Sequence, residues 1–388
     1  MARILHISKY HPPFAGGIES FVADLIPAQI KQGHTVAAVV HDHQPSIKKI
    51  AKKITAEEGT AGELIYRVPS FGRLLYAPVA PHFPYWLKKI IQEFKPDSLH
   101  IHVPNTSAFW LFALACARDC QWVIHWHSDV ISTIDSRLSL AYRIYRPFEQ
   151  ALLKRADKVI VTSPPYLASS AALASWHHKS EVIALGIDSQ RLPDPTETAL
   201  TWAQQRWQKN SIKLLTIGRL TYYKGHEILI RALATCQNKN IELCIVGKGE
   251  QQESLQQLIN TLGLQQQVNL LGFCEAEQLT ALLAHCDCFC LPSLERTEAF
   301  GVVLMEAMRY AKPVIASDIK GSGVTWVVTN KVTGTLVPPQ NVKALATALD
   351  ELAQQPERYH AYGQAGYQRF KVTFDIDKVA ETISPLYP

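Results

Sequence analysis

The sequence predicts an α/β protein built from two doubly wound domains. Three observations lead to this fold class. Short, near-continuous apolar runs alternate with amphipathic helical stretches, the alternation lapses once near residue 190, and the length of 388 residues is that of more than one domain. Strands that are apolar on both faces are typical of parallel sheets covered by helices. We therefore expect two Rossmann-like domains that face each other across a cleft.

The first half opens with a β-loop-α-β unit. Residues 2–8 form an apolar run, Gly16 and Gly17 make a turn, a helical pattern covers Ile18–Lys31, and Thr35–Val40 follows as a strand. Later strands are predicted at Ser98–Val103, Trp122–His127 and Lys158–Thr162.

A polar stretch with two prolines, SQRLPDPTET, follows Asp188 and has the composition of a linker. A second series of strands is expected at Lys213–Ile217, Glu242–Val246, Val268–Leu271, Cys288–Leu291 and Pro313–Ala316. The predicted domains are 1–188 and 189–370. The segment 371–388 is expected to pack back on the first domain through a helix near Val379–Ile383.

Composition excludes several classes of protein. Hydrophobic residues make up 47% and charged residues 19%, which is too apolar for a disordered chain. The net charge of +5, without a basic run, argues against nucleic-acid binding. No apolar stretch reaches the length of a membrane span, and Ala108–Ala117 is predicted as a buried helix. Cys286, Cys288 and Cys290 are interpreted as core residues of a reducing compartment, so we expect a soluble, cytoplasmic protein.

The segment Ser293–Ser317 carries the most chemical information. A strand ends at Leu291, and a helix is expected to start near Phe300-Gly301, with Glu298 just before it and Glu306 inside it. A helix N-terminus offers unpaired N–H groups to a diphosphate, and carboxylates on either side can bind sugar hydroxyls. The alternative is that Glu298 caps the helix and Glu306 is solvated.

Glu298 and Glu306 are separated by seven residues, and this spacing resembles the E-x7-E signature of retaining glycosyltransferases of family 4, which have the GT-B fold. The resemblance covers nearly the whole chain. It implies that Glu298 contacts the donor sugar and that Glu306 binds the nucleotide ribose. It also implies that the backbone of Ala299, Phe300 and Gly301 meets the diphosphate.

Arg219 and Lys224 lie in the loop after the strand Lys213–Ile217. Two cations at this spacing can converge on a diphosphate, although an ordinary basic loop has the same appearance. The pair resembles the family's Arg and Lys, which neutralise the leaving diphosphate.

Three further loops that contain glycine each follow a predicted strand. By resemblance, Gly16 and Gly17 approach the donor phosphates or the acceptor, and Gly247 and Phe273 flank the nucleotide base. Each of these loops is equally explained as a turn. The loop after Pro313–Ala316 contains Gly321 and Gly323 but lacks the Glu that the family often carries there.

His125 and His127 alternate at the end of a strand, so both lie on one face. They resemble the HxH pair of metal-dependent hydrolases, but the remaining histidines weighed as ligands fall mostly in helical or linker stretches. By resemblance to the glycosyltransferases, His127 meets the donor sugar, and His125 is expected to pack within the sheet.

The resemblance implies transfer of a hexosyl group from a nucleoside-diphosphate sugar, guessed as GDP-mannose or a UDP-hexose, to a glycan or lipid-linked acceptor in polysaccharide or lipopolysaccharide assembly. We expect no cofactor and no metal, because no DxD-like motif stands at a strand end. The alternatives are a sugar-nucleotide epimerase or phosphorylase on the same fold, a metal-dependent hydrolase, and a non-catalytic nucleotide-sugar binder.

Residues 1–190 hold 20 basic and 15 acidic side chains and therefore carry the whole excess of positive charge. This half is expected to bind the acceptor. A basic and aromatic surface in this half predicts peripheral contact with the inner face of the cell membrane, through its anionic lipids. The alternative is a basic protein surface that is solvated. Its residues are Lys48, Lys49, Lys52, Lys53, Arg67, Phe71, Arg73, Tyr76, Phe83, Tyr85, Trp86, Lys88 and Lys89.

Overall fold

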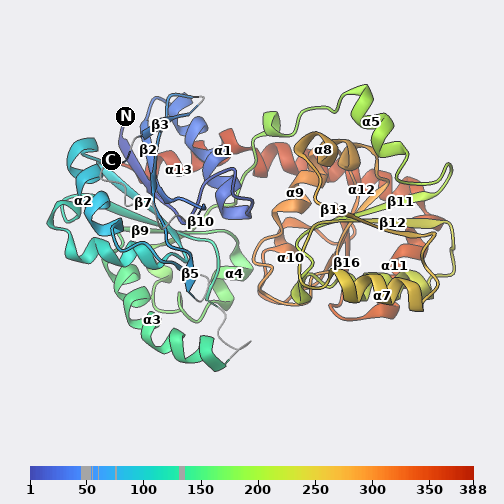
Figure 1. Ribbon diagram of the computed structural model, residues 1–388. Coiled ribbons are helices and arrows are strands. Elements are labelled where there is room, and N and C mark those ends of the chain that lie inside the picture. The colour runs from blue at the N-terminus through green and yellow to red at the C-terminus, as the bar shows by residue number, and fades with distance from the viewer. Residues whose placement is uncertain (45–53, 55, 60, 75–76, 131–135) are drawn as a thin grey trace. The chain divides into compact units, whose positions relative to one another are not determined.

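The computed structural model describes residues 1–44, 54, 56–59, 61–74, 77–130 and 136–388 (Figure 1). The chain divides into two units, and each is described by itself. The first comprises Met1–Asp188 together with Ile376–Pro388, and the second comprises Ser189–Asp375. Each unit is a Rossmann-like α/β domain, as the resemblance to the GT-B fold implies.

The first unit contains a sheet with the strand order β10-β9-β8-β7-β1-β2-β4-β3, in which only β3 is antiparallel among the described strands. The strands are β1 (Arg3–Ile7), β2 (Thr35–His41), β3 (Ala56–Glu58), β4 (Leu64–Val68), β7 (Ser98–Val103), β8 (Gln121–Trp126), β9 (Lys158–Val161) and β10 (Ser180–Val182). A separate ribbon pairs β5 (Arg73–Leu74) with β6 (Ala77–Pro78). The helices are α1 (Gly17–Lys31), α2 (Phe83–Phe94), α3 (Ser136–Arg155), α4 (Pro164–Ser169) and α13 (Ile376–Ile383).

The second unit, all of whose residues are described, contains a parallel sheet with the order β13-β12-β11-β14-β15-β16. The strands are β11 (Ile212–Ile217), β12 (Ile241–Val246), β13 (Val268–Gly272), β14 (Cys288–Leu291), β15 (Val314–Ser317) and β16 (Gly334–Val337). The helices are α5 (Glu197–Gln204), α6 (His226–Thr235), α7 (Gln252–Thr261), α8 (Ala276–His285), α9 (Val302–Arg309), α10 (Val324–Val327), α11 (Val342–Gln354) and α12 (Pro356–Arg369).

The strand order reverses once in each parallel series. In the first unit the reversal lies between β1 and β7, and in the second it lies between β11 and β14. Ligands of doubly wound folds bind outside the carboxyl ends of the strands at such a point. Strands β7 and β14 at these points are fully buried, and the polar residues of β7, Ser98, His100 and His102, are buried with its apolar ones.

The predicted buried helix at Ala108–Ala117 is wrong. The segment forms two 3-10 helices, Thr106–Ala113 and Ala115–Ala117, separated by the extended residue Leu114. Ala108 and Leu111 are buried, but Trp110 and Phe112 are exposed. One side of this segment therefore packs on the unit, and the other side, which carries Trp110 and Phe112, is exposed.

The C-terminal segment joins the first unit later than predicted. It begins at Ile376 rather than 371, because Phe370 and Phe374 are buried in the second unit, where Phe374 packs on Trp326 with ring centroids 5.7 Å apart. Helix α13 then packs on α1.

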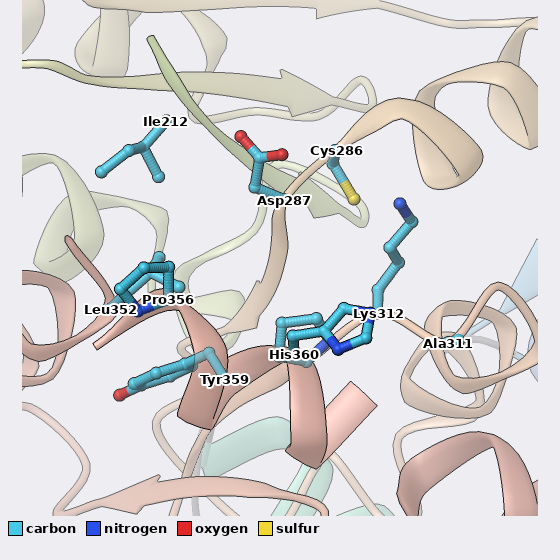
Figure 2. Close-up of a pocket in the computed structure, with 10 residues that line it drawn as sticks. Ile212, Cys286, Asp287, Ala311, Lys312, Leu352, Pro356, Tyr359 and His360 are labelled. Carbon is cyan, nitrogen blue, oxygen red and sulfur yellow. The ribbon is translucent and has the colours of Figure 1, made fainter. Parts of the chain in front are cut away.

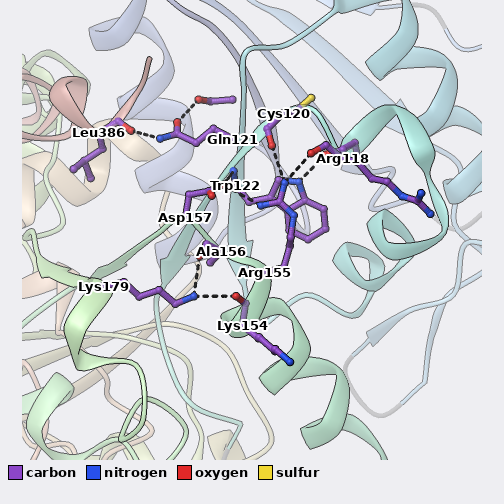
Figure 3. A network of polar contacts seen from close by, with 12 residues as sticks. Arg118, Cys120, Gln121, Trp122, Lys154, Arg155, Ala156, Asp157, Lys179 and Leu386 are labelled. Carbon is purple, nitrogen blue, oxygen red and sulfur yellow. Dashed lines mark hydrogen bonds and ion pairs between the residues drawn. The ribbon is translucent and has the colours of Figure 1, made fainter.

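The end of the chain is fastened to β8 by a polar network (Figure 3). The Gln121 side chain donates to the carbonyl of Leu386 at 2.8 Å and accepts from Ser98 at 2.6 Å. Next to it, Arg155 donates to the carbonyls of Arg118 and Cys120. The bond from Gln121 holds Leu386, the residue before Tyr387, against β8.

Candidate functional site

A buried ion pair lies at the carboxyl ends of β11 and β14. Lys224 Nζ is 2.6 Å from Glu298 Oε2, and the Ser293 hydroxyl donates to the same oxygen at 2.9 Å. The side chains of Lys224 and Glu298 are only 13% and 11% exposed. The structure therefore brings together two of the residues predicted to act on the donor.

The charge of Lys224 is stabilised by its partner. Burial by itself lowers the pKa of this ammonium, but the charge of Glu298, the neighbouring Tyr223 and the hydrogen bond to Glu298 outweigh burial and raise it. Lys224 is therefore a permanent cation in a largely dry environment, where a charge interacts strongly with an anionic ligand.

A glycine permits the two loops to approach each other. Gly225 has φ +70°, and a Cβ placed on it would lie 2.0 Å from the carbonyl oxygen of Pro292. The N–H of Leu294 also donates to the carbonyl of Tyr223 at 2.8 Å. The loop that carries Lys224 is thus fixed directly on the loop that leads to Glu298.

Helix α9 begins at Val302 with Gly301 as its N-cap residue, at φ +83° and with no side-chain cap. Glu298 therefore does not cap this helix, and that alternative is wrong. The loop before the helix is held by its backbone, since the Ser322 hydroxyl donates to the carbonyl of Glu298 and the Gly323 N–H donates to that of Ala299 at 2.7 Å. Phe300 is buried in the core.

Glu306 lies on α9 and is half-buried, so the interpretation as a solvated residue is also wrong. Arg191 Nη2 is 3.6 Å from its Oε1. Burial raises the pKa of Glu306, and the charges of Arg191 and Lys224 oppose this shift. Sequence reasoning missed Arg191, Ser293 and Ser322, and placed Arg191 in a linker.

Arg219 differs from Lys224 in its surroundings. Its side chain is exposed and donates only a long bond of 3.4 Å to the Tyr223 hydroxyl, while its carbonyl accepts from His226 at 3.3 Å. The sequence predicts that both cations converge on the diphosphate. The structure holds Lys224 in a buried pair and leaves Arg219 exposed.

Two further predicted residues lie on neighbouring strand ends of the second unit. The N–H of Gly247 donates to Gly272 at 2.8 Å, and a Cβ on Gly247 would lie 1.9 Å from the Gly218 carbonyl. Phe273 is 60% exposed and lies under Lys248, whose Nζ is 5.9 Å from the ring centroid. An exposed aromatic ring at a strand end can stack on a nucleotide base.

In the first unit, Gly16 and Gly17 start helix α1. Gly16 is its N-cap residue in extended backbone, and a Cβ there would lie 2.1 Å from Glu19 Oε2. This close contact is with the end of a side chain that can move aside, so packing does not explain Gly16, and its contact with the donor or acceptor stays a prediction.

His127 follows β8 and belongs to a buried group of imidazoles that we call the five-histidine cluster. Its members lie on β1, β7 and β8 at the reversal of strand order, and they are His6, His100, His102, His125 and His127. Their rings stack across the strands, with His125 and His127 only 4.3 Å apart between centroids. Sequence reasoning weighed the wrong histidines as partners for His125 and His127.

The cluster has the donor atoms of a metal site but a different bonding pattern. One nitrogen each from His102, His125 and His127 lie within 4.8 Å of one another, as do nitrogens of His6, His100 and His102. Direct N–H···N bonds of 2.9–3.2 Å link these rings instead. Burial lowers the pKa of His6 to about 4 and that of His127 to about 3, and keeps the others well below 6.5. Metal independence stays a prediction.

A pocket of about 300 Å³ lies elsewhere in the second unit (Figure 2). Ile212, Asp287 and Lys312 line it, and they stand at the amino ends of β11, β14 and β15. The pocket is therefore at the opposite edge of the sheet from Lys224 and Glu298, and we assign it no part in the site.

The predicted basic and aromatic surface is partly wrong. Phe83 and Trp86 are buried, Arg67 pairs with Glu57 at 2.7 Å, and Arg73 lies over the ring of Phe14 at 4.9 Å. The rings of Phe83 and Trp86 are therefore packed inside the unit, whereas the predicted residues Arg73, Tyr85, Lys88 and Lys89 are exposed. The predicted positions Lys48, Lys49, Lys52, Lys53 and Tyr76 lie outside the described residues. Within the described part of the chain, no helix has the length and apolar character needed to cross a membrane.

Comparisons with known proteins agree with these observations. Residues 15–191 match the family described as Glycosyltransferase Family 4, and residues 201–369 match Glycosyl transferases group 1. The chain is 32% identical to D-rhamnosyltransferase WbpZ of Pseudomonas aeruginosa, over 96% of this chain and 92% of the relative. It is 28% identical to O-antigen chain mannosyltransferase C of Escherichia coli, over 99% and 98%. Sucrose-phosphate synthase from Thermosynechococcus elongatus superposes with a TM-score of 0.81 at 25% identity, over 100% and 98%.

Proposed function

The chain belongs to the family 4 glycosyltransferases, and from this premise we propose that it transfers a hexosyl group from a nucleoside-diphosphate sugar to a hydroxyl of a glycan or lipid-linked acceptor, with retention at the anomeric carbon. The observation that carries the proposal is the buried Lys224–Glu298 pair at the reversal of strand order in the second unit.

The pair supports a role in departure of the diphosphate. Negative charge accumulates on the leaving group, and preorganised cations and N–H groups lower the barrier most where water is excluded. Lys224, the exposed Arg219 and the start of α9 at Gly301 supply such groups at adjacent strand ends. Glu298 accepts a hydrogen bond from Lys224 and has further acceptor capacity for a sugar hydroxyl.

Glu306 and Arg191 support binding of the nucleotide. A half-buried carboxylate held by an arginine accepts hydrogen bonds from vicinal ribose hydroxyls. By resemblance to the family, His127 contacts the sugar, and Gly247 and Phe273 flank the base. The backbone at Ala299, Phe300 and Gly301 would face the phosphates.

We propose a mannose-configured donor for polysaccharide or lipopolysaccharide assembly. The two relatives are named for mannosyl and D-rhamnosyl transfer, and D-rhamnose is D-mannose without its 6-hydroxyl group. GDP-mannose is thus the first donor to test, followed by UDP-hexoses.

Contact with an anionic membrane is also proposed, on a different surface from that predicted by the sequence. Helix α3 exposes Leu140, Ile144 and Phe148 at 63%, 68% and 48%, and their four-residue spacing places them on one face. Arg143 and Arg146 are exposed nearby. An apolar stripe flanked by arginines fits the surface of an anionic bilayer. Co-sedimentation with anionic vesicles that is unchanged by Leu140→Ser and Ile144→Ser would contradict this surface.

The function is tested by incubating the protein with GDP-, UDP- and ADP-sugars and a crude glycolipid acceptor, with and without EDTA. We expect one donor to yield nucleoside diphosphate and an α-linked product at a rate that EDTA does not change. Lys224→Met should lower turnover by about 10²–10³-fold. Lys248→Met, which removes an exposed cation of a neighbouring loop, serves as the matched control. Turnover abolished by EDTA would favour a metal enzyme, and equal turnover of both variants would refute the site.

A further inference from the structure

The five-histidine cluster is organised by two hydrogen-bonded chains that start at one side chain, Gln29 of helix α1. The first chain runs from Gln29 Oε1 to His6 Nε2 at 2.7 Å, from His6 Nδ1 to His102 Nε2 at 2.9 Å, and from His102 Nδ1 to His127 Nε2 at 2.9 Å. All four side chains are buried. The chain therefore ends at the residue to which the resemblance assigns the donor sugar.

The second chain passes through the C-terminal segment. Gln29 Nε2 donates to the Tyr387 hydroxyl at 2.7 Å, this hydroxyl is 2.7 Å from His100 Nδ1, and His100 Nε2 is 3.2 Å from His125 Nδ1. Tyr387 is itself buried, and the polar network of Figure 3 fixes the residue before it.

The position of every proton in the first chain follows from the amide. A neutral imidazole has one donor nitrogen and one acceptor nitrogen. An amide oxygen only accepts, so His6 must carry its proton on Nε2. His6 Nδ1 is then an acceptor and takes the Nε2–H of His102, whose Nδ1 takes the Nε2–H of His127.

The same reasoning fixes the second chain. The Tyr387 oxygen accepts from the amide, and the buried hydroxyl proton finds its acceptor when it points to His100 Nδ1, the other polar atom bonded to it. His100 is then protonated on Nε2 and donates to His125 Nδ1, which leaves the proton of His125 on Nε2. With the Gln29 amide oxygen facing His6, all five imidazoles are therefore Nε2–H tautomers, and reversing this single amide would convert all five to the Nδ1–H form.

The two chains end on unused nitrogens. Among the described residues, neither His127 Nδ1 nor His125 Nε2 has a hydrogen-bond partner, although both atoms are buried. His127 Nδ1 is a bare acceptor in this arrangement, and His125 Nε2 carries a proton. The ring of Phe21 lies edge-on to both imidazoles, with centroids 4.9 Å from His125 and 5.7 Å from His127.

We infer that Gln29 and Tyr387 are positioning residues that hold His127 in the Nε2–H tautomer, so that its Nδ1 accepts a hydrogen bond from a hydroxyl of the transferred sugar. The tautomer assignment stands on the first unit alone. Only the contact with the sugar rests on the proposed function. The inference also gives the C-terminal segment a role beyond packing, since Tyr387 lies 260 positions after His127 in the sequence.

The test is ¹⁵N NMR of the full-length protein labelled at histidine, which distinguishes bare from protonated ring nitrogens. We expect five imidazoles with bare Nδ1 and protonated Nε2 that do not titrate between pH 8 and 6. A cluster histidine in the Nδ1–H form, or a charged one at pH 7, would overturn the inference.

Gln29→Met removes the amide at similar volume and should leave His6, His102 and His127 as mixtures of tautomers. Gln32→Met, at the end of the same helix, is the matched control and should leave them unchanged. His34 reports correct folding, because its ring nitrogens bond to the Ala2 N–H at 3.1 Å and to the Ser384 hydroxyl at 2.8 Å and not to the Gln29 side chain. If Gln29→Met does not fold, Tyr387→Phe is the second variant, and it should leave His100 and His125 as mixtures of tautomers. Fixed Nε2–H tautomers in a folded variant would refute the role of the residue replaced.

An activity measurement separates this inference from the proposed function. With an active donor in hand, Gln29→Met should lower kcat about tenfold, the lower end of the effect seen when a metal-bound histidine loses its outer hydrogen-bonding partner. If the NMR spectra are as expected but the protein transfers no sugar, the proposed function is refuted and the tautomer assignment stands. Normal kcat together with mixed tautomers would refute the role of the tautomer in catalysis.

Discussion

The two units place polar side chains at equivalent points of their sheets but stabilise them in opposite ways. In the first, the five-histidine cluster lies between β1, β7 and β8 and is neutral, because burial lowers the pKa of each ring and the rings bond to one another. In the second, Lys224 and Glu298 lie between β11 and β14 as a charged pair. Neutral rings suit recognition of hydroxyl groups, whereas a buried cation suits stabilisation of a leaving phosphate.

The largest expected effect comes from removing the charge of Lys224 from the buried pair of the second unit. Lys224→Met should lower turnover by about 10²–10³-fold, because a preorganised cation is lost from the leaving group. It should also destabilise the protein by about 3–5 kcal/mol, because Glu298 is left buried without its partner. Steady-state kinetics and urea unfolding measure the two effects. Arg219→Met is the control, and a similar loss of stability there would contradict the distinction between buried and exposed cations.

Acid should affect the neutral side of the comparison first. Burial lowers the pKa of His6 to about 4 and that of His127 to about 3, whereas an unfolded histidine has a pKa of about 6.5. Between these pH values the unfolded chain binds protons that the folded unit does not. Stability is therefore complete above the unfolded pKa of about 6.5 and falls towards pH 4, by about 1.4 kcal/mol per pH unit for each such histidine.

Hydrogen exchange at pH 7, 6 and 5 resolves the two units. We expect β1, β7 and β8 to lose protection before β11 and β14, although His226 in the second unit also has a pKa lowered to about 4 by burial and by Lys224. Earlier loss of protection in β11 and β14 would show that the cluster does not limit stability in acid.

A smaller effect is expected from the support of Glu306. Arg191→Ala removes a cation 3.6 Å from this carboxylate and so raises its pKa further. We expect KM for the donor to increase about fivefold with little change in kcat, because a ribose contact is used in the ground state and the transition state alike. A large fall in kcat at unchanged KM would place Arg191 in the chemistry instead.

The smallest effect concerns the loop that lacks the family's Glu. The Ser322 hydroxyl donates to the carbonyl of Glu298, so Ser322→Ala should cost about 1 kcal/mol of stability. Thermal unfolding checks this value, with Thr325→Ala as a control on a more exposed hydroxyl of the same segment. No loss at Ser322 would mean that the Glu298 loop is held without this bond.

Local sequence determined most of the fold and much of the second unit's site. The strands at Ser98–Val103 and Cys288–Leu291 were predicted with the bounds that the structure has, because runs buried on both faces have sharp ends. The loops of Lys224 and Glu298 follow such strands directly. The family resemblance predicted that both residues act on the donor. The pairing of β11 with β14 explains why they meet, because carboxyl ends of adjacent parallel strands share one edge.

The five-histidine cluster could not be predicted in the same way, because it depends on register between distant strands. The pairing of β1 with β7 sets His6 beside His100, and that of β7 with β8 sets His102 beside His125. The alternation in SLHIHV and QWVIHWH was a visible signal, but sequence alone does not say that the two strands are neighbours. Arg191 was missed since its partner, Glu306, lies more than a hundred residues away.

The central claim is that the Lys224–Glu298 pair exists for the donor and not for the fold. The most direct test is the double variant Lys224→Met/Glu298→Leu, assayed for both unfolding free energy and sugar transfer. Because replacing a buried ion pair by apolar side chains is often neutral for stability, we expect near wild-type stability with no detectable transfer from the active donor. A stable double variant that still transfers sugar at the wild-type rate would contradict the account.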